Sequence, residues 1–171
     1  MASRSLLLLA LALTGATAMS AASVETRHDP KVDFSQFHTY VWKTEKGPTA
    51  PDVDLQIRAA AEAELAERGL KKAKGEEKAD LVLIYNAGLS DSLVPGGFGV
   101  GLGWWGGFIG VPTGESNVSA GIAFFLRRAD SDELIWAGWL VQKATNDYAP
   151  ILLRQKAPKF AKKILSRYPP D

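Results

Sequence analysis

The side chains that could do chemistry are few and lie far apart in this 171-residue chain. The two histidines, His28 and His38, are the natural candidates for acid–base or metal chemistry. His28 falls in a polar lead-in and His38 stands among aromatic residues that predict a strand, so we expect a catalytic or metal role for neither. Asp80 directly precedes an apolar run and is typical of a turn residue before a strand. The absence of cysteine excludes thiol catalysis, disulfides and cysteine-based metal sites.

Known catalytic motifs do not change this picture. The sequence has no nucleophile elbow, zinc-protease helix motif or phosphate-binding loop. Gly101–Gly106 formally fits G-x-G-x-x-G, but the further glycines and Pro112 exclude the helix that a dinucleotide site requires. Asp130–Glu133 lacks the glycine and distal glutamate of a calcium loop, and predicts a hairpin turn instead. We therefore expect no cofactor, no metal and no enzyme, although a hydrolase stays open because triads are defined by geometry rather than order.

The most distinctive stretch is Pro95–Pro112, within a run that has no charge between Asp91 and Glu115. Apolar residues alternate with glycines over Phe98–Trp104, and this period of two places them on one face of an extended segment. We expect an extended or hairpin-like flap that packs on its own sheet, exposes an aromatic surface to a partner, lipid headgroup or glycan, or is a disordered tether. The candidate contact residues in it are Phe98, Trp104, Trp105 and Phe108.

A second candidate surface is the basic C-terminal helix expected over Pro150–Tyr168. A solvated face is its simplest interpretation, and contact with anionic lipid or lipopolysaccharide phosphates is the alternative. The formal net charge of +1 predicts no polyanion partner, and an export signal argues against nucleic acid. Its cations are Arg154, Lys156, Lys159, Lys162, Lys163 and Arg167, of which Lys159, Lys162 and Lys163 are the candidate contact residues.

The elements that must position these residues centre on a hairpin of Val118–Leu126 and Leu134–Val141. Apolar residues on both faces of its second strand indicate a central place in the sheet. Further strands are predicted over Phe37–Trp42 and Ala79–Ala87. The order β-α-β-(insert)-β-β-α predicts one α+β domain, with an antiparallel or mixed sheet of about four strands and two helices on one face.

The first helix is predicted from Asp54 to Arg68, with Asp54 as its N-cap and Gly69 just beyond its end. Capping also explains the nearby Asp52. Glu64 and Arg68 have the spacing of an exposed ion pair. The expected core stripe consists of Ile57, Ala61 and Leu65. In the C-terminal helix, Pro158 predicts a kink or a division into two short helices.

The N-terminal residues have the pattern of a secretory signal: Arg4, the apolar run Leu6–Leu13, and a small-x-small site ending at Ala18. We expect cleavage after Ala18, with Ala22 as the second choice, and then a flexible lead-in over residues 19–31 before a domain at 32–171. The apolar run is shorter than the ~20 residues that span a bilayer. The mature chain is expected to be periplasmic or secreted, without a membrane span or a lipid-bearing cysteine.

Several short segments occur in the same order as in one bacterial family. Asp33–Trp42, DFSQFHTYVW, resembles the D-F-S-x-(F/Y)-x-T-(Y/F)-x-W segment of the DUF4136 proteins. The resemblance covers roughly residues 31–170 and implies a cell-envelope protein, commonly a lipoprotein, with no catalytic residues to transfer. The other matching segments are Arg68–Leu70, Ala79–Leu81, a Gly/Trp-rich insert, Leu134–Gly138 and the terminal Pro169-Pro170.

Together these features predict a non-enzymatic domain of the cell envelope that binds an envelope protein or an anionic membrane surface. The alternative is a structural or stress-related periplasmic protein whose flap is packed.

Overall fold

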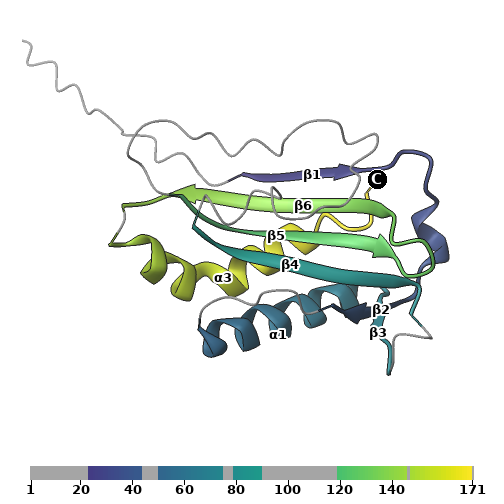
Figure 1. Ribbon diagram of the computed structural model, residues 1–171, viewed down its shortest axis with the longest axis horizontal. Coiled ribbons are helices and arrows are strands. Elements are labelled where there is room, and N and C mark those ends of the chain that lie inside the picture. Colours follow the sequence, from purple (N-terminus) through teal and green to yellow (C-terminus); the bar gives the residue numbers. More distant parts are fainter. Residues whose placement is uncertain (1–22, 44–49, 75–78, 90–118, 146, 171) are drawn as a thin grey trace, which may run out of the picture.

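One mixed sheet of six strands organises the molecule (Figure 1). The computed structural model describes residues 23–43, 50–74, 79–89, 119–145 and 147–170. The strand order is β1-β6-β5-β4-β2-β3, in which β2 runs parallel to β3 and β4, and the other pairs are antiparallel. The strands are β1 Val24–His28, β2 Thr39–Trp42, β3 Lys71–Lys72, β4 Leu81–Leu89, β5 Ser119–Arg128 and β6 Leu134–Lys143.

The predicted hairpin is present as β5 and β6, with Ile122 opposite Leu140. A turn joins the two strands where the sequence predicted it, and Asp132 adopts the left-handed backbone there, with φ 57°. Strand β6 lies between β1 and β5, so its predicted central position is confirmed. One apolar face of β6 belongs to the core under the helices, and the other belongs to a separate apolar cluster.

The expectation of about four strands was wrong, because the two edge strands β1 and β3 were not predicted. Residues 24–28, assigned from sequence to the lead-in, pair with β6 along only one edge and leave most of their side chains exposed. Lys71–Lys72, for which the sequence predicted no strand, forms a short strand beside β2. An edge strand that is solvated on its outer side needs no apolar alternation, so neither segment has a strand pattern.

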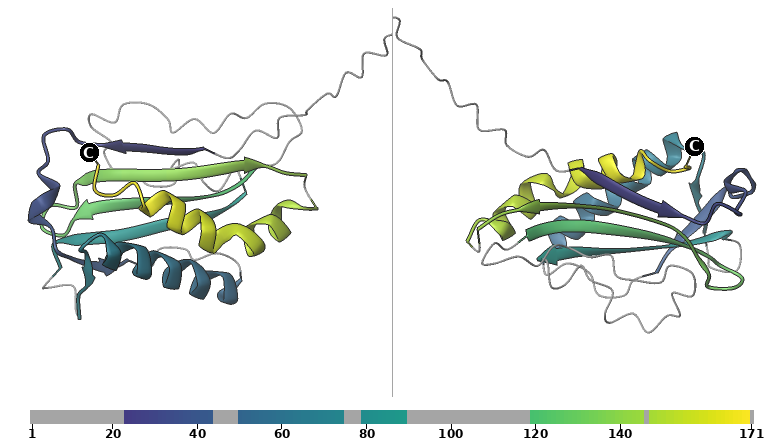
Figure 2. Two further views of the ribbon diagram at one scale, coloured as in Figure 1. Left: turned by 180° about the vertical axis from the view of Figure 1, so that it is seen from behind. Right: turned by 90° about the horizontal axis from the view of Figure 1, so that it is seen from above.

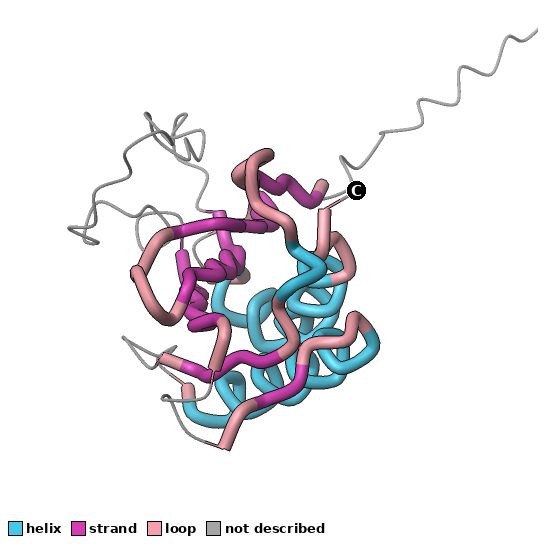
Figure 3. Tube along the Cα trace, turned by 90° about the vertical axis from the view of Figure 1, so that its right-hand side faces the viewer, coloured by secondary structure: helices cyan, strands magenta, loops and turns pink. Residues whose placement is uncertain are grey.

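Two helices, α1 (Pro51–Glu67) and α3 (Ala149–Leu165), cover one face of the sheet, as predicted (Figures 2 and 3). Helix α1 begins before its expected cap: the N-cap is Ala50, which makes no side-chain hydrogen bond. Asp52 and Asp54 therefore lie in the first turn rather than cap it. Helix α3 is a single helix that includes Pro158, so the division in two is not observed. A 3₁₀ turn, η1 (Phe34–Gln36), precedes β2.

The main core lies between the sheet and the two helices. The predicted stripe on α1 is buried, and it is extended by Val53. The buried residues of α3 are Ala149, Leu152, Ala157, Phe160, Ala161, Ile164 and Leu165. Gly138 of β6 faces α3 with no room for a side chain: a Cβ there would lie 2.5 Å from Trp136 Cη2 and 2.8 Å from Ile164 Cγ2. The indole of Trp136 thus occupies the space that a side chain at position 138 would fill.

Candidate functional site

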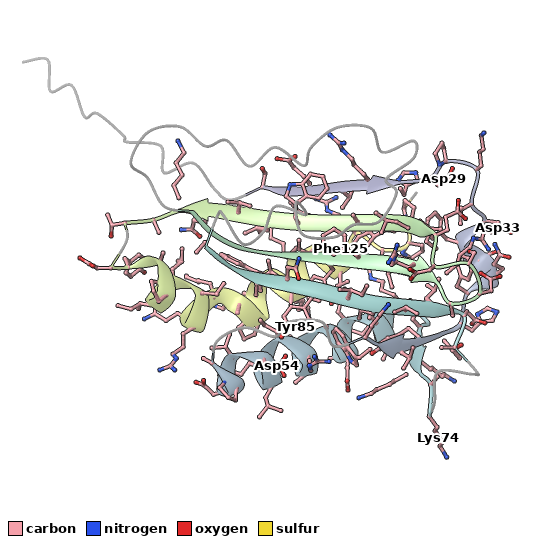
Figure 4. The ribbon with its side chains drawn as sticks, in the orientation of Figure 1. Asp29, Asp33, Asp54, Lys74, Tyr85 and Phe125 are labelled. Atoms are coloured by element: carbon pink, nitrogen blue, oxygen red, sulfur yellow. The ribbon has the colours of Figure 1, made fainter. Side chains whose placement is uncertain are left out.

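A group of ionisable and aromatic side chains joins α1 to β2 and β4. Asp54 of α1 accepts a hydrogen bond from the Tyr85 hydroxyl of β4 (Figure 4). Arg58, one turn further along α1, donates from Nε to both Asp54 carboxylate oxygens at 2.9 and 3.1 Å. Its guanidinium lies over the rings of Trp42 and Tyr85, 4.6 and 5.5 Å from their centroids. One cation is thereby shared between a carboxylate and two aromatic faces.

The same group continues along α1 to Glu62. The Trp42 indole N–H donates to Glu62 Oε1 at 2.8 Å, and Lys72 Nζ of β3 donates to the same oxygen at 2.7 Å. Asp54, Arg58 and Glu62 are spaced by four residues, so they lie along one side of the helix. That spacing is visible in the sequence, but the interpretation of Asp54 as a cap missed it, and no local pattern links it to Trp42 or Tyr85.

The protonation states explain why the group is held together. Burial raises the pKa of Tyr85 well above its usual range, and the hydrogen bond to Asp54 adds to this effect, so the hydroxyl keeps its proton. Burial acts to raise the pKa of Glu62, but the hydrogen bonds from Lys72 and Trp42 outweigh it and lower that pKa overall. At neutral pH the group consists of two carboxylates, two cations and neutral aromatic donors. The opposite charges compensate one another, so this group serves as a structural contact between α1 and the sheet.

Asp80 forms a second polar contact, at the start of β4. Its Oδ2 accepts hydrogen bonds from the backbone N–H groups of His38 and Thr39, at 2.9 and 2.8 Å, and from the Thr39 hydroxyl at 2.8 Å. The Asp80 N–H donates in return to Thr39 Oγ1 at 3.0 Å. Partial burial opposes the charge of Asp80, but these hydrogen bonds lower the pKa of its carboxyl. Asp80 thus joins the start of β2 to the start of β4, as expected of a residue before a strand.

Replacing Asp80 with alanine is expected to cost about 1 kcal/mol of the free energy of unfolding at pH 7, in the range of lost capping contacts. Because folding lowers the pKa of this carboxyl, the stabilisation is present above the unfolded pKa, about 3.9, and is lost as the pH falls through the folded pKa. Urea unfolding of wild type and Asp80→Ala at pH 7 and at pH 3 measures both effects. The exposed turn residue Asp130 supplies the control, Asp130→Ala. A wild-type advantage that is equal at both pH values contradicts the prediction.

A shallow groove of about 250 Å³ runs between α1 and α3. Glu64 and Arg68 make the predicted ion pair at 3.2 Å, but Glu64 is only 3% exposed, so its expected position on the outside was wrong. Lys162 Nζ of α3 lies 3.9 Å from the other Glu64 oxygen and covers it. The groove is lined by Ala60, Ala63, Glu64, Glu67, Pro158, Lys159 and Lys162.

The structure brings two of the predicted contact lysines together. Lys159 and Lys162 both line the groove, whereas Lys163 is exposed beside it on α3. The aromatic candidates Phe98, Trp104, Trp105 and Phe108 lie outside the described residues.

Exposed apolar side chains lie near the other end of the two helices. Leu55 of α1 is 68% exposed and Ile151 of α3 is 49% exposed. They flank the ion pair of Arg154 with Asp52, which joins the helices at 3.4 Å. Leu55 stands about two turns before the groove residues of α1, and Ile151 about three turns before Lys162, so the apolar residues and the groove share one side of the helix layer.

Among the described residues, no three histidine, aspartate or glutamate side chains are grouped to hold a metal ion. No helix in the same part of the chain is both long and apolar enough to cross a membrane.

Comparison with known proteins identifies relatives of this architecture. A family model described as "Domain of unknown function (DUF4136)" matches residues 24–170. The crystal structure of a DUF4136 family protein from Bacteroides thetaiotaomicron superimposes with a TM-score of 0.58 at 18% identity, covering 86% of this chain and 96% of that one. A PDZ domain protein from Parabacteroides distasonis gives a TM-score of 0.61 at 14% identity, covering 88% of this chain but 36% of that one. At these identities the likeness concerns the fold. No curated protein matches the chain.

Proposed function

Because this chain belongs to the DUF4136 family over residues 24–170, a family of unknown function, we propose a role from its own surfaces. It is a non-enzymatic domain of the cell envelope that binds an envelope protein. The observation that carries this proposal is the outer side of the helix layer, where exposed lysines, a groove and exposed apolar residues occur together. Such a combination of an apolar surface with a charged rim is typical of interaction surfaces.

The polar groups of the molecule support a binding role over catalysis. Asp54, Arg58 and Tyr85 are occupied with one another, and the Asp80 carboxylate is occupied by backbone and hydroxyl donors. A catalytic group must instead face a substrate and have a partner that activates it. A location in the periplasm or outside the cell is supported by the signal pattern in residues 1–18 and by the absence of a lipid-bearing cysteine.

The contact residues that we propose on α3 are Lys159, Lys162 and Lys163. A protein partner fits better than an anionic bilayer, because the acidic residues Asp52 and Glu67 share this side of the helix layer and a negatively charged membrane would repel them. The second proposed contact surface is the set Phe98, Trp104, Trp105 and Phe108. The main alternative function, a structural or stress-related protein whose flap is packed, is favoured by an apolar cluster on the opposite face of the sheet.

Co-sedimentation of the mature protein with purified envelope fractions tests the proposal. Replacing Lys159, Lys162 and Lys163 together with glutamine is expected to weaken binding on the order of tenfold, since rim charges contribute a few tenths to 1 kcal/mol each. The matched control changes Lys31, Lys71 and Lys74, which are exposed outside the helix pair, to glutamine and should bind as wild type does.

Two further samples show whether the partner is a protein or a lipid and whether the aromatic surface takes part in binding. Protease treatment of the fractions should abolish binding, whereas retained binding, or equal binding to phosphatidylglycerol vesicles, would identify a lipid surface instead. A deletion of residues 96–111 that remains folded tests the aromatic surface. If wild type does not bind, or both lysine variants bind equally, the proposed role of α3 is wrong.

A further inference from the structure

The face of the sheet away from the helices is apolar and buried. Ile84 of β4, Phe125 of β5 and Trp139 of β6 are 3%, 8% and 7% exposed. They form a cluster with Ala123 and Ala137, separate from the main core. Phe125 alternates with Phe124 and Leu126, which belong to the core under the helices, so it lies on the opposite face of β5.

The described elements do not account for this burial. Helices α1 and α3 both lie on the other face (Figure 2), and no described helix or strand lies over this cluster. Side chains stand roughly perpendicular to a sheet, and a packed second layer lies about 10 Å away. Neighbours within the same sheet therefore shield the base of a large ring but not its outer side. A covering layer of some kind is required over Phe125 and Trp139.

The connection between β4 and β5 starts and ends at this cluster's own strands. Leu89 at the end of β4 pairs with Ala120 at the start of β5, so a turn of about two residues would be enough to join them. The chain instead places residues 90–118 there. The other undescribed segments fit less well, because 44–49 and 75–78 are short and 1–18 have the pattern of a removed signal.

The length and composition of residues 90–118 match the surface. At ~3.3 Å per residue, a segment that runs out and back over this length reaches on the order of 45 Å, more than the ~30 Å that the 10 residues of β5 span. No charge occurs between Asp91 and Glu115, so the segment can cover an apolar face without burying an ion. The alternation of apolar residues with glycine over Phe98–Trp104 supplies one apolar side.

We propose that residues 90–118 dock on this face of their own chain, with the stretch Phe98–Trp104 against Ile84, Phe125 and Trp139. The sheet is then covered on both faces, by the helices and by this segment. The docking narrows the aromatic contact surface proposed above, because it packs Phe98 and Trp104 on the sheet. Trp105 and Phe108, which fall outside the alternation, then stay with the α3 lysines as the groups that meet a partner.

Because the chain has no cysteine, the labelling rate of a single introduced cysteine measures whether its position on the sheet is covered. Ala123→Cys and Ala137→Cys place a thiol on this face, and Ala161→Cys places an equally buried thiol under the helices as the control. Each is labelled with a thiol reagent in the purified mature protein, and again after residues 96–111 are replaced by a Gly/Ser linker of equal length. The replacement should speed labelling at positions 123 and 137 by about tenfold or more and leave position 161 unchanged.

Rapid labelling at 123 and 137 in the intact chain, or continued protection with the linker, overturns the proposal. Protection that disappears on dilution also overturns it, because the cover would then come from a second copy. If the linker exposes position 161 as well, the decision falls to a disulfide between Ala123→Cys and a cysteine at Val100 or Leu102, which share the apolar side of the segment. Formation of that disulfide within one chain supports docking, and its absence at both positions rejects it.

Discussion

Replacing Gly138 with alanine is expected to lower the free energy of unfolding by about 2–3 kcal/mol, the upper part of the range for overpacked cores. The new methyl group would stand 2.5 and 2.9 Å from two ring atoms of Trp136, and 2.8 Å from Ile164 Cγ2. Neither neighbour is free to move, because Trp136 and Ile164 are both fully buried. Alanine also restricts the unfolded chain, which stabilises by about 0.4–1 kcal/mol, so the clash must exceed that gain. Denaturant unfolding with an unchanged slope measures the loss.

Gly69→Ala is the matched control for this substitution. Gly69 ends α1 with a φ of +86° and has no atom within 4 Å of the new Cβ. Its replacement costs only the left-handed backbone penalty, about 1 kcal/mol. A loss at Gly138 that is no greater than the loss at Gly69 would show that the contact between β6 and α3 adjusts without cost.

Replacing Trp136 with alanine is expected to be the most damaging single change in the core, at about 3–5 kcal/mol. The indole is fully buried, and its ring meets the ring of Tyr168 edge-on, with centroids 5.8 Å apart. Removal leaves a large cavity between β6, α3 and the C-terminal residues. Trp136→Phe keeps an aromatic ring and should lose clearly less. Unfolding midpoints of the two variants measure the difference, and equal losses would contradict the role of ring packing.

The two substitutions should also be coupled. Without the indole, a methyl group at position 138 has room, so Trp136→Ala combined with Gly138→Ala should lose less than the sum of the single changes. Trp42→Ala combined with Gly138→Ala is the control pair, because Trp42 lies on β2, three strands away from β6, and packs on α1, so the two effects should add. Additivity in both pairs would show that Trp136 is not what excludes a side chain at 138.

The segments that identify the family are explained by these contacts. Asp33 caps η1 by accepting a hydrogen bond from the Ser35 N–H at 2.9 Å, and Asp80 holds Thr39 at the start of β2. Gly69 turns the chain so that Leu70 returns to the core. Leu134–Gly138 contains the paired Trp136 and Gly138. These segments therefore describe how this fold is assembled.

Local patterns determined much of the architecture before any tertiary contact was considered. Alternation and apolar runs predicted the β5–β6 hairpin, and helical spacing predicted the buried stripe on α1, because burial on one side of an element leaves a period in its sequence. The family resemblance is confirmed by the match over residues 24–170. The two-helix layer on one face also followed from the order of the elements.

Tertiary contacts determine the features that leave no periodic pattern in the local sequence. The edge strands β1 and β3 exist because β6 and β2 offer them hydrogen bonds, and Glu64 is buried because α3 lies over it. The group around Asp54 and Tyr85 joins residues that are 31 positions apart, so no local window contains it. The period of a sequence shows which side of a helix or strand is apolar. Which distant residues contact that side is determined only when the helices and strands pack together.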